Sequence, residues 1–125
     1  MSDVEKASSE DKSQIGVTPA GREILERLKG EYFASEKAAF QASIALALEL
    51  GLEPSAEVGF ETKWGLGTMS GVLEFLAWYL PTETPARAAE RLGDAGLRYV
   101  ESGIETGKTI SEIFARDPKN NADAG

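Results

Sequence analysis

The side chains that could do chemistry in this chain are carboxylates, lysines, tyrosines and hydroxyls, because the sequence has neither histidine nor cysteine. Histidine is the commonest general base and metal ligand, and cysteine supplies disulfides and thiolate metal sites. A carboxylate-based enzyme would have to use residues such as Glu57, Glu61 and Glu74, whose spacing matches no familiar catalytic pair. We therefore expect no enzyme, with no catalytic residue, no cofactor site and no metal site.

Residues 103–109, GIETGKT, are similar to the phosphate-binding P-loop, GxxxxGK[ST]. The run has three rather than four residues between Gly103 and Gly107, and it follows a helical pattern instead of a buried strand. No acidic motif after a strand is present to hold magnesium. The sequence therefore predicts no nucleotide cofactor.

The formal net charge is −8, from 21 acidic and 13 basic residues. Nucleic-acid-binding proteins commonly present a basic face to the phosphates, so this charge argues against DNA binding without excluding a local basic patch. Arg87 and Arg91 are four residues apart, and Glu90 and Asp94 are close enough to form a solvated, ion-paired face with neighbouring arginines. The candidates for nucleic-acid contact are Lys29, Lys37, Lys63, Arg87 and Arg91.

The first residues of the chain are polar, without the apolar stretch of a secretory signal. No run approaches the roughly 20 apolar residues that span a bilayer, and acidic charge opposes binding to anionic lipid. We expect a cytoplasmic protein without a membrane partner.

Residues 35–51 predict a central helix, against which the other elements pack. Ser35 is a good N-cap, and Gly51 can adopt the positive φ that often ends a helix. Apolar residues occupy nearly every face between them, which is typical of a helix buried on several sides. Its neighbours must come from the rest of the chain or from a second copy.

Further helices are indicated by capping and helical spacing of apolar residues. Thr-Pro pairs at residues 18–19 and 84–85 begin two of them, and the first ends near Gly30. Thr68 reads as the cap of another, which stops at Pro81, and either Thr109 or Ser111 caps a short last helix. In the helix after residue 84, small residues predict a close approach to the central helix: Ala88, Ala89, Gly93 and Gly96.

The predicted fold class is therefore all-α, a compact bundle of four to five short helices around the buried central helix at residues 35–51. At 125 residues the chain has material for one domain, which we place at residues 17–116. Residues 1–16 and 117–125 are polar and too poor in apolar groups to offset the entropy of ordering, so we expect disordered tails.

Residues 54–67 form a connection that is interrupted by glycines and is long for a small domain. Its apolar residues are expected to be buried, either in the core or at an interface. Alternation near residue 60 also suits a brief strand. The aromatic residues could be a lid over the core or an interface for a homo-oligomer or a protein partner, and Trp78 lies off the main stripe of its helix. The candidate partner interface is Val58, Phe60, Trp64, Leu66 and Trp78.

The succession ILERLK, SIALALELGLEP, FETKWGLG and DAGLRYVESGI resembles the layout of the small DndE-type proteins of DNA phosphorothioate-modification systems, over about residues 20–105. The resemblance implies a helical, oligomeric accessory to DNA modification. It also implies that the first two helices are similar to the helical part of ribbon-helix-helix proteins.

Two functions remain open. The first is a non-enzymatic, self-associating helical interaction protein that acts as an accessory in a bacterial DNA-modification or defence system, a setting that the resemblance alone implies. The alternative is a DNA-binding regulator of ribbon-helix-helix type. That function needs a basic, alternating strand directly before the central helix, and GEYFA at residues 30–34 is a poor match.

Overall fold

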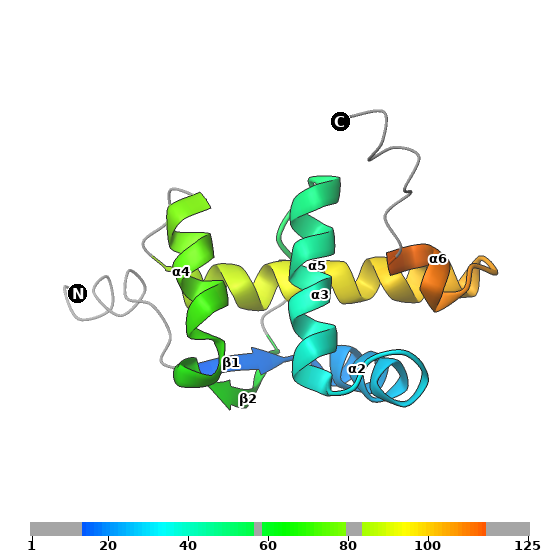
Figure 1. The fold of residues 1–125 in the computed structure, drawn as a ribbon, viewed down its shortest axis with the longest axis horizontal. Helices are drawn as coiled ribbons and strands as arrows, with labels where there is room; N and C mark the ends of the chain where they lie inside the picture. Colours follow the sequence, from blue (N-terminus) through cyan, green and yellow to red (C-terminus); the bar gives the residue numbers. More distant parts are fainter. Residues whose placement is uncertain (1–13, 57–58, 80–83, 115–125) are drawn as a thin grey trace.

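A computed structural model describes residues 14–56, 59–79 and 84–114 (Figure 1). The elements are β1 (Gln14–Val17), α2 (Pro19–Glu31), α3 (Glu36–Leu50), β2 (Glu61–Gly65), the 3₁₀ helix η1 (Leu66–Met69), α4 (Ser70–Tyr79), α5 (Pro85–Glu105) and α6 (Ile110–Phe114). The predicted mainly helical, compact fold is confirmed, with a small two-stranded sheet in addition. Of the tails predicted at residues 1–16 and 117–125, residues 1–13 and 117–125 lie outside the described residues.

Helix α5 is the longest element and packs against α2, α3, α4, α6 and β1. In Figure 1 it runs horizontally behind α3 and α4, which both cross it. The most extensive contact in the fold is between α3 and α5. At this crossing a Cβ on Gly96 would overlap the carbonyl oxygen of Ser43, and one on Gly93 would overlap the ring of Phe40. The predicted close approach to α3 is therefore confirmed.

The predicted caps of α2 and α3 are confirmed. Thr18 Oγ1 accepts the Gly21 N–H at 3.0 Å, and Ser35 Oγ accepts the Ala38 N–H at 3.0 Å. Gly51 ends α3 with a φ of 67°, in the left-handed region that side chains disfavour. Local sequence signals are therefore sufficient to place both helices.

The start of α4 differs from the prediction, and the start of α5 agrees with it. Helix α4 begins at Ser70, because the chain passes directly into it from η1, the 3₁₀ turn that contains Thr68. Helix α5 begins at Pro85 with Thr84 as its N-cap residue, as the Thr-Pro pair predicts, and the side chain of Thr84 makes no capping hydrogen bond.

The short helix α6 begins with a capping box at Thr109, which decides between the two predicted caps. The Thr109 N–H donates to Glu112 Oε1 at 2.8 Å, and the Glu112 N–H donates to Thr109 Oγ1 at 3.0 Å. Two hydrogen bonds from Thr109 lower the pKa of the Glu112 carboxyl. The bond from the backbone has the larger effect, and the bond from the hydroxyl has the smaller one.

The N-terminal tail predicted at residues 1–16 is corrected at its end, because residues 14–16 belong to strand β1. Ile15 and Val17 are fully buried, and β1 pairs antiparallel with β2, with Ile15 opposite Trp64 and Val17 opposite Glu61. The pairing is irregular between Ile15 and Gly16. A strand of four residues with a partner far along the sequence carries too little local signal to be distinguished from a tail.

Two buried carboxylates of α5 hold β1 and the start of α2. Glu90 Oε2 accepts the Gly16 N–H at 2.8 Å, and Asp94 Oδ1 accepts the Thr18 hydroxyl at 3.0 Å. Arg98 Nε lies 3.6 Å from Asp94 Oδ1. The solvated face predicted for Glu90 and Asp94 is therefore wrong, since both are at least 98% buried and face β1 and α2.

The core lies between α5 and the elements that cross it, and α3 is not buried all round. Ala45 is exposed and Leu50 is half-exposed on its outer side. None of the helices in the described part of the chain is long and apolar enough to cross a membrane. The largest fully buried apolar side chains are Phe40, Ile15, Leu25, Leu28, Met69, Leu76, Leu97, Val17 and Val100.

Candidate interaction surface

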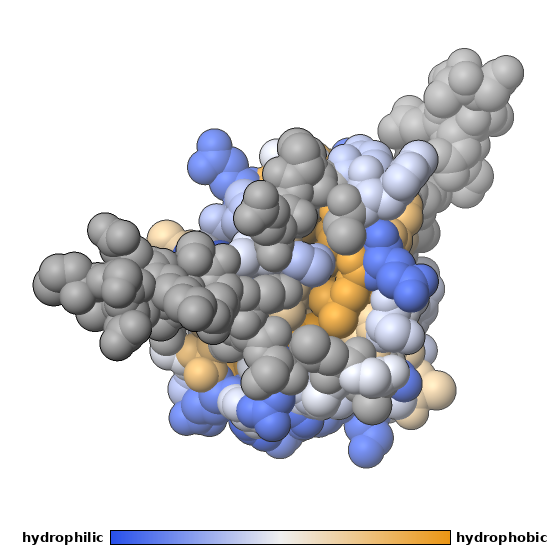
Figure 2. All heavy atoms as spheres, turned by 90° about the vertical axis from the view of Figure 1, so that its left-hand side faces the viewer, coloured by the Kyte–Doolittle hydropathy of each residue, from blue (hydrophilic) through white to orange (hydrophobic). Residues whose placement is uncertain are grey.

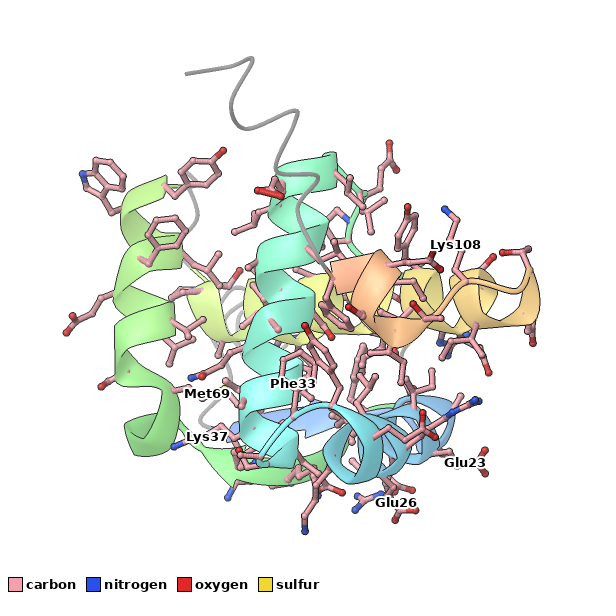
Figure 3. The ribbon with its side chains drawn as sticks, turned by 45° about the vertical axis from the view of Figure 1, so that its right-hand side comes forward. Glu23, Glu26, Phe33, Lys37, Met69 and Lys108 are labelled. Carbon is pink, nitrogen blue, oxygen red and sulfur yellow. The ribbon has the colours of Figure 1, made fainter. Side chains whose placement is uncertain are left out.

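Three aromatic side chains project from α4 and form what we call the α4 aromatic face: Phe75, Trp78 and Tyr79. Their exposed fractions are 47%, 80% and 52%. The rings of Phe75 and Tyr79 are stacked with centroids 5.3 Å apart, and the centroids of Phe75 and Trp78 are 6.4 Å apart. Figure 3 shows aromatic rings gathered at the C-terminal end of this helix.

The aromatic face follows from the sequence of α4, SGVLEFLAWY. Leu76 is fully buried, and Val72 and Leu73 pack partly against the core, so one stripe of the helix already faces inward. Phe75, Trp78 and Tyr79 stand at positions i, i+3 and i+4, which share a flank beside that stripe. Glu74 is the single charged residue of the helix. The exposed flank of α4 is thus aromatic where a solvated helix is usually polar.

Figure 2 views the molecule from the side that carries α4 and shows hydrophobic residues exposed among polar ones. A single exposed apolar residue is ordinary on a protein surface, but neighbouring large aromatics commonly mark an interaction site. Tyrosine and tryptophan bury large areas with few rotatable bonds, which is why they are frequent at interface hot spots. The α4 aromatic face is therefore our candidate interaction surface.

A second apolar region lies at the junction of α2, α3 and α6, and we call it the α3 groove. Phe33 packs edge-on against both Tyr32 and Phe114, with ring centroids 4.9 Å and 5.0 Å away. The groove has a volume of about 250 Å³ and is open on one side. Figure 3 shows Phe33 between α2, α3 and α6. Its lining residues are Tyr32, Phe33, Ala42, Ala45, Leu46 and Phe114.

The structure separates the five interface residues that the sequence predicted. Trp78 is the most exposed of the large hydrophobic residues whose side chains the structure describes. Trp64 is instead half-buried against the core, with its ring centroid 5.0 Å from that of Phe40, and Phe60 is half-buried. These contacts favour the lid interpretation for Trp64. Val58 lies outside the described residues, and Leu66 lies in η1.

Sequence reasoning named Trp78 as a contact candidate but missed Phe75 and the surface that the two make with Tyr79. The signal was present in the spacing, since the three residues fall on one side of a helix once the core stripe is assigned to another. The core stripe is formed by Val72, Leu73 and Leu76.

The candidate nucleic-acid contacts are divided among several elements. Lys29 and Lys37 are exposed near the start of α3, where Figure 3 labels Lys37. Lys63 is mostly buried and forms a 2.6 Å ion pair with Glu36, and its Nζ lies 5.4 Å from the centre of the Trp64 ring.

The two arginines among these candidates, Arg87 and Arg91, lie on α5 and are half-buried. Arg91 Nη1 donates to the carbonyl of Ser55 at 3.3 Å, so this guanidinium helps to hold the segment that follows α3. Lys63 and Arg91 therefore have structural contacts that compete with a role on phosphates.

Within residues 14–56, 59–79 and 84–114 no group of three or more acidic side chains is arranged to hold a metal ion. The GIETGKT run forms the end of α5 and the turn into α6, so it lacks the strand that precedes a P-loop. Comparisons with protein-family models, curated proteins and solved structures found no match to this chain. The function is therefore inferred from the exposed side chains of the molecule.

Proposed function

We propose that this protein is a non-enzymatic helical interaction protein that self-associates through the α4 aromatic face. The observation that carries the proposal is the 80% exposure of Trp78 beside two further half-exposed aromatic rings. Water contact with so much apolar area is unfavourable, at roughly 25 cal/mol for each Å². Association that covers these rings recovers that free energy.

Charge supports a second copy of the chain as the occupant. Two copies each carry a formal charge of −8, so contact between their acidic surfaces would be repulsive. The α4 aromatic face contains no charged residue, and Glu74 is the sole charge on the helix. Copies that meet through this face bring few like charges together, which favours self-association.

The cellular setting in the proposal is a bacterial DNA-modification or defence system, in which the protein is an accessory. This setting rests on the sequence resemblance to DndE-type proteins. A small, mainly helical domain with an exposed aromatic helix is compatible with an assembly role of that kind, and co-purification from the native host with intact-mass analysis identifies the complex.

Trp78→Ala is expected to shift the protein toward monomer, because truncating a hot-spot tryptophan commonly costs about 2 kcal/mol or more, roughly a thirtyfold weaker association. Sedimentation velocity over a concentration series measures the shift, and circular dichroism should show unchanged helix content. Tyr99→Ala is the matched control, since Tyr99 is an exposed aromatic on α5 outside the aromatic face. A native protein that is monomeric at high micromolar concentration would contradict self-association.

The order β1–α2–α3 favours the alternative of a ribbon-helix-helix regulator, because it places a strand before two helices. Such a regulator uses its strand to read DNA. Here β1 contains no lysine or arginine, pairs with β2 of its own chain, and gives its Gly16 N–H to Glu90. Both sides of the strand are therefore occupied within one molecule.

Duplex DNA is accordingly expected to bind more weakly than about 10⁻⁶ M at physiological salt, at or below ordinary non-specific affinity. A fluorescence-anisotropy titration with the native protein measures it, and a salt series separates specific from electrostatic binding. Sequence-selective nanomolar binding would replace the interaction protein with the regulator.

A further inference from the structure

We infer that self-association is head-to-tail, with the α4 aromatic face of one copy seated in the α3 groove of the next. This inference rests on the proposed function and adds the surface that receives the aromatic rings. It commits to a second copy of this chain as the occupant of the groove.

The groove is suited in size and chemistry to a protein side chain. Its volume of about 250 Å³ is below the roughly 300–1,000 Å³ typical of small-molecule pockets. No lysine, arginine, aspartate or glutamate is among its described lining residues, and its walls are aromatic rings and small aliphatic groups. Tyr32 already stacks on Phe114 with ring centroids 6.3 Å apart, and an aromatic side chain such as Trp78 would extend this cluster in a stacked or edge-on arrangement, the two that aromatic pairs prefer.

The two surfaces lie at different ends of the molecule. Figures 1 and 3 place α4 at one end of α5 and α6, which borders the groove, at the other end. One chain therefore cannot fill its own groove with its own α4. A contact between two different surfaces is heterologous, and its repetition produces a closed ring or an open chain of copies.

A symmetrical pairing of two α4 helices would cover the aromatic face but leave the groove open. Two of the residues that line the groove are exposed: Tyr32, at 49%, and Ala45. In the head-to-tail arrangement each copy buries both its aromatic face and its groove, whereas in the symmetrical dimer each copy buries only its aromatic face, so more apolar area per copy is removed from water. This difference in burial favours the heterologous arrangement.

Two variants distinguish the head-to-tail arrangement from the symmetrical one. One variant changes the aromatic face, and the other changes the groove. Trp78→Ala removes the projecting side chain and keeps the groove. Ala45→Arg places a long charged side chain in the groove and keeps the aromatic face, at an exposed helical position where arginine is well tolerated. Ser102→Arg, at an exposed position on α5 outside the groove, controls for the added charge.

Sedimentation velocity is carried out on each protein alone and on an equal mixture of Trp78→Ala and Ala45→Arg. We expect each variant alone to be monomeric, Ser102→Arg to assemble like the native protein, and the mixture to form a one-to-one dimer that grows no further. Native mass spectrometry identifies that dimer by its two different masses.

Other outcomes overturn the inference in distinguishable ways. If Ala45→Arg assembles like the native protein while Trp78→Ala is monomeric, the contact is symmetrical through α4, and the proposed function stands without the head-to-tail arrangement. Two monomeric variants that fail to combine would also exclude the head-to-tail arrangement. If the native protein is itself monomeric, the proposed function and the inference both fail.

Discussion

Replacing Ile44 with aspartate is expected to unfold the protein. Ile44 is 97% buried in α3, at the helix that makes the most extensive contact with α5. A carboxylate at this position would be removed from water without a partner, or would have to bind a proton. The expected loss exceeds about 4 kcal/mol, a large part of the roughly 5–15 kcal/mol that stabilises an ordinary domain.

Thermal unfolding followed by circular dichroism measures this effect, and the variant should show no cooperative transition. Ala45→Asp is the matched control, because it introduces the same side chain at the next position of the same helix, where the native residue is exposed. We expect it to keep a cooperative transition. An Ile44→Asp variant that melts like the native protein would show that α3 does not pack as described.

Gly96→Ala is expected to destabilise the fold by forcing α3 and α5 apart. A Cβ at this position would overlap the backbone carbonyl of Ser43, whose carbonyl carbon would lie 2.8 Å away. Backbone cannot move aside as a flexible side chain can, so the helices must separate. Overpacking of this kind costs about 1–3 kcal/mol or more, against a gain of roughly 1 kcal/mol in helix propensity.

Gly30→Ala is the control for Gly96→Ala, because Gly30 also lies in a helix and its Cβ would meet no atom within 4 Å. This control should be neutral or slightly stabilising, while Gly96→Ala should lower the unfolding temperature by several degrees, given about 4–8 °C for each kcal/mol in a domain of this size. Equal melting temperatures would place the helix crossing elsewhere.

The parts of the fold that the sequence predicted are those with local causes. Ser35 and Gly51 delimit α3 through bonds and dihedral angles that involve neighbouring residues, and Thr18 does the same for α2. Strand β1 depends instead on β2 and on Glu90, which are distant in sequence. A glutamate in a helix beside arginines carries no local sign that it will be buried against a strand, which is why the solvated face predicted for Glu90 is wrong.

The candidate site also combines features with local causes and features that depend on distant contacts. Both tryptophans were named from the sequence as contact candidates, and nothing local distinguishes them. Trp64 is partly covered because β2 places it against Phe40, whereas Trp78 lies on the flank of α4 that no other described element covers. Which tryptophan is a lid and which is exposed is decided by tertiary packing.

The bonds between β1 and α5 also determine the order in which the protein can fold. Gly16 and Thr18 are joined to Glu90 and Asp94 across separations of 74 and 76 residues. During synthesis β2, which pairs with β1, is made before α5, but the two carboxylates that hold β1 and Thr18 are missing until α5 has been made. Long-range contacts of this kind slow folding because the chain loses entropy before they form. The first strand of the fold to be synthesised is therefore among the last to be fixed.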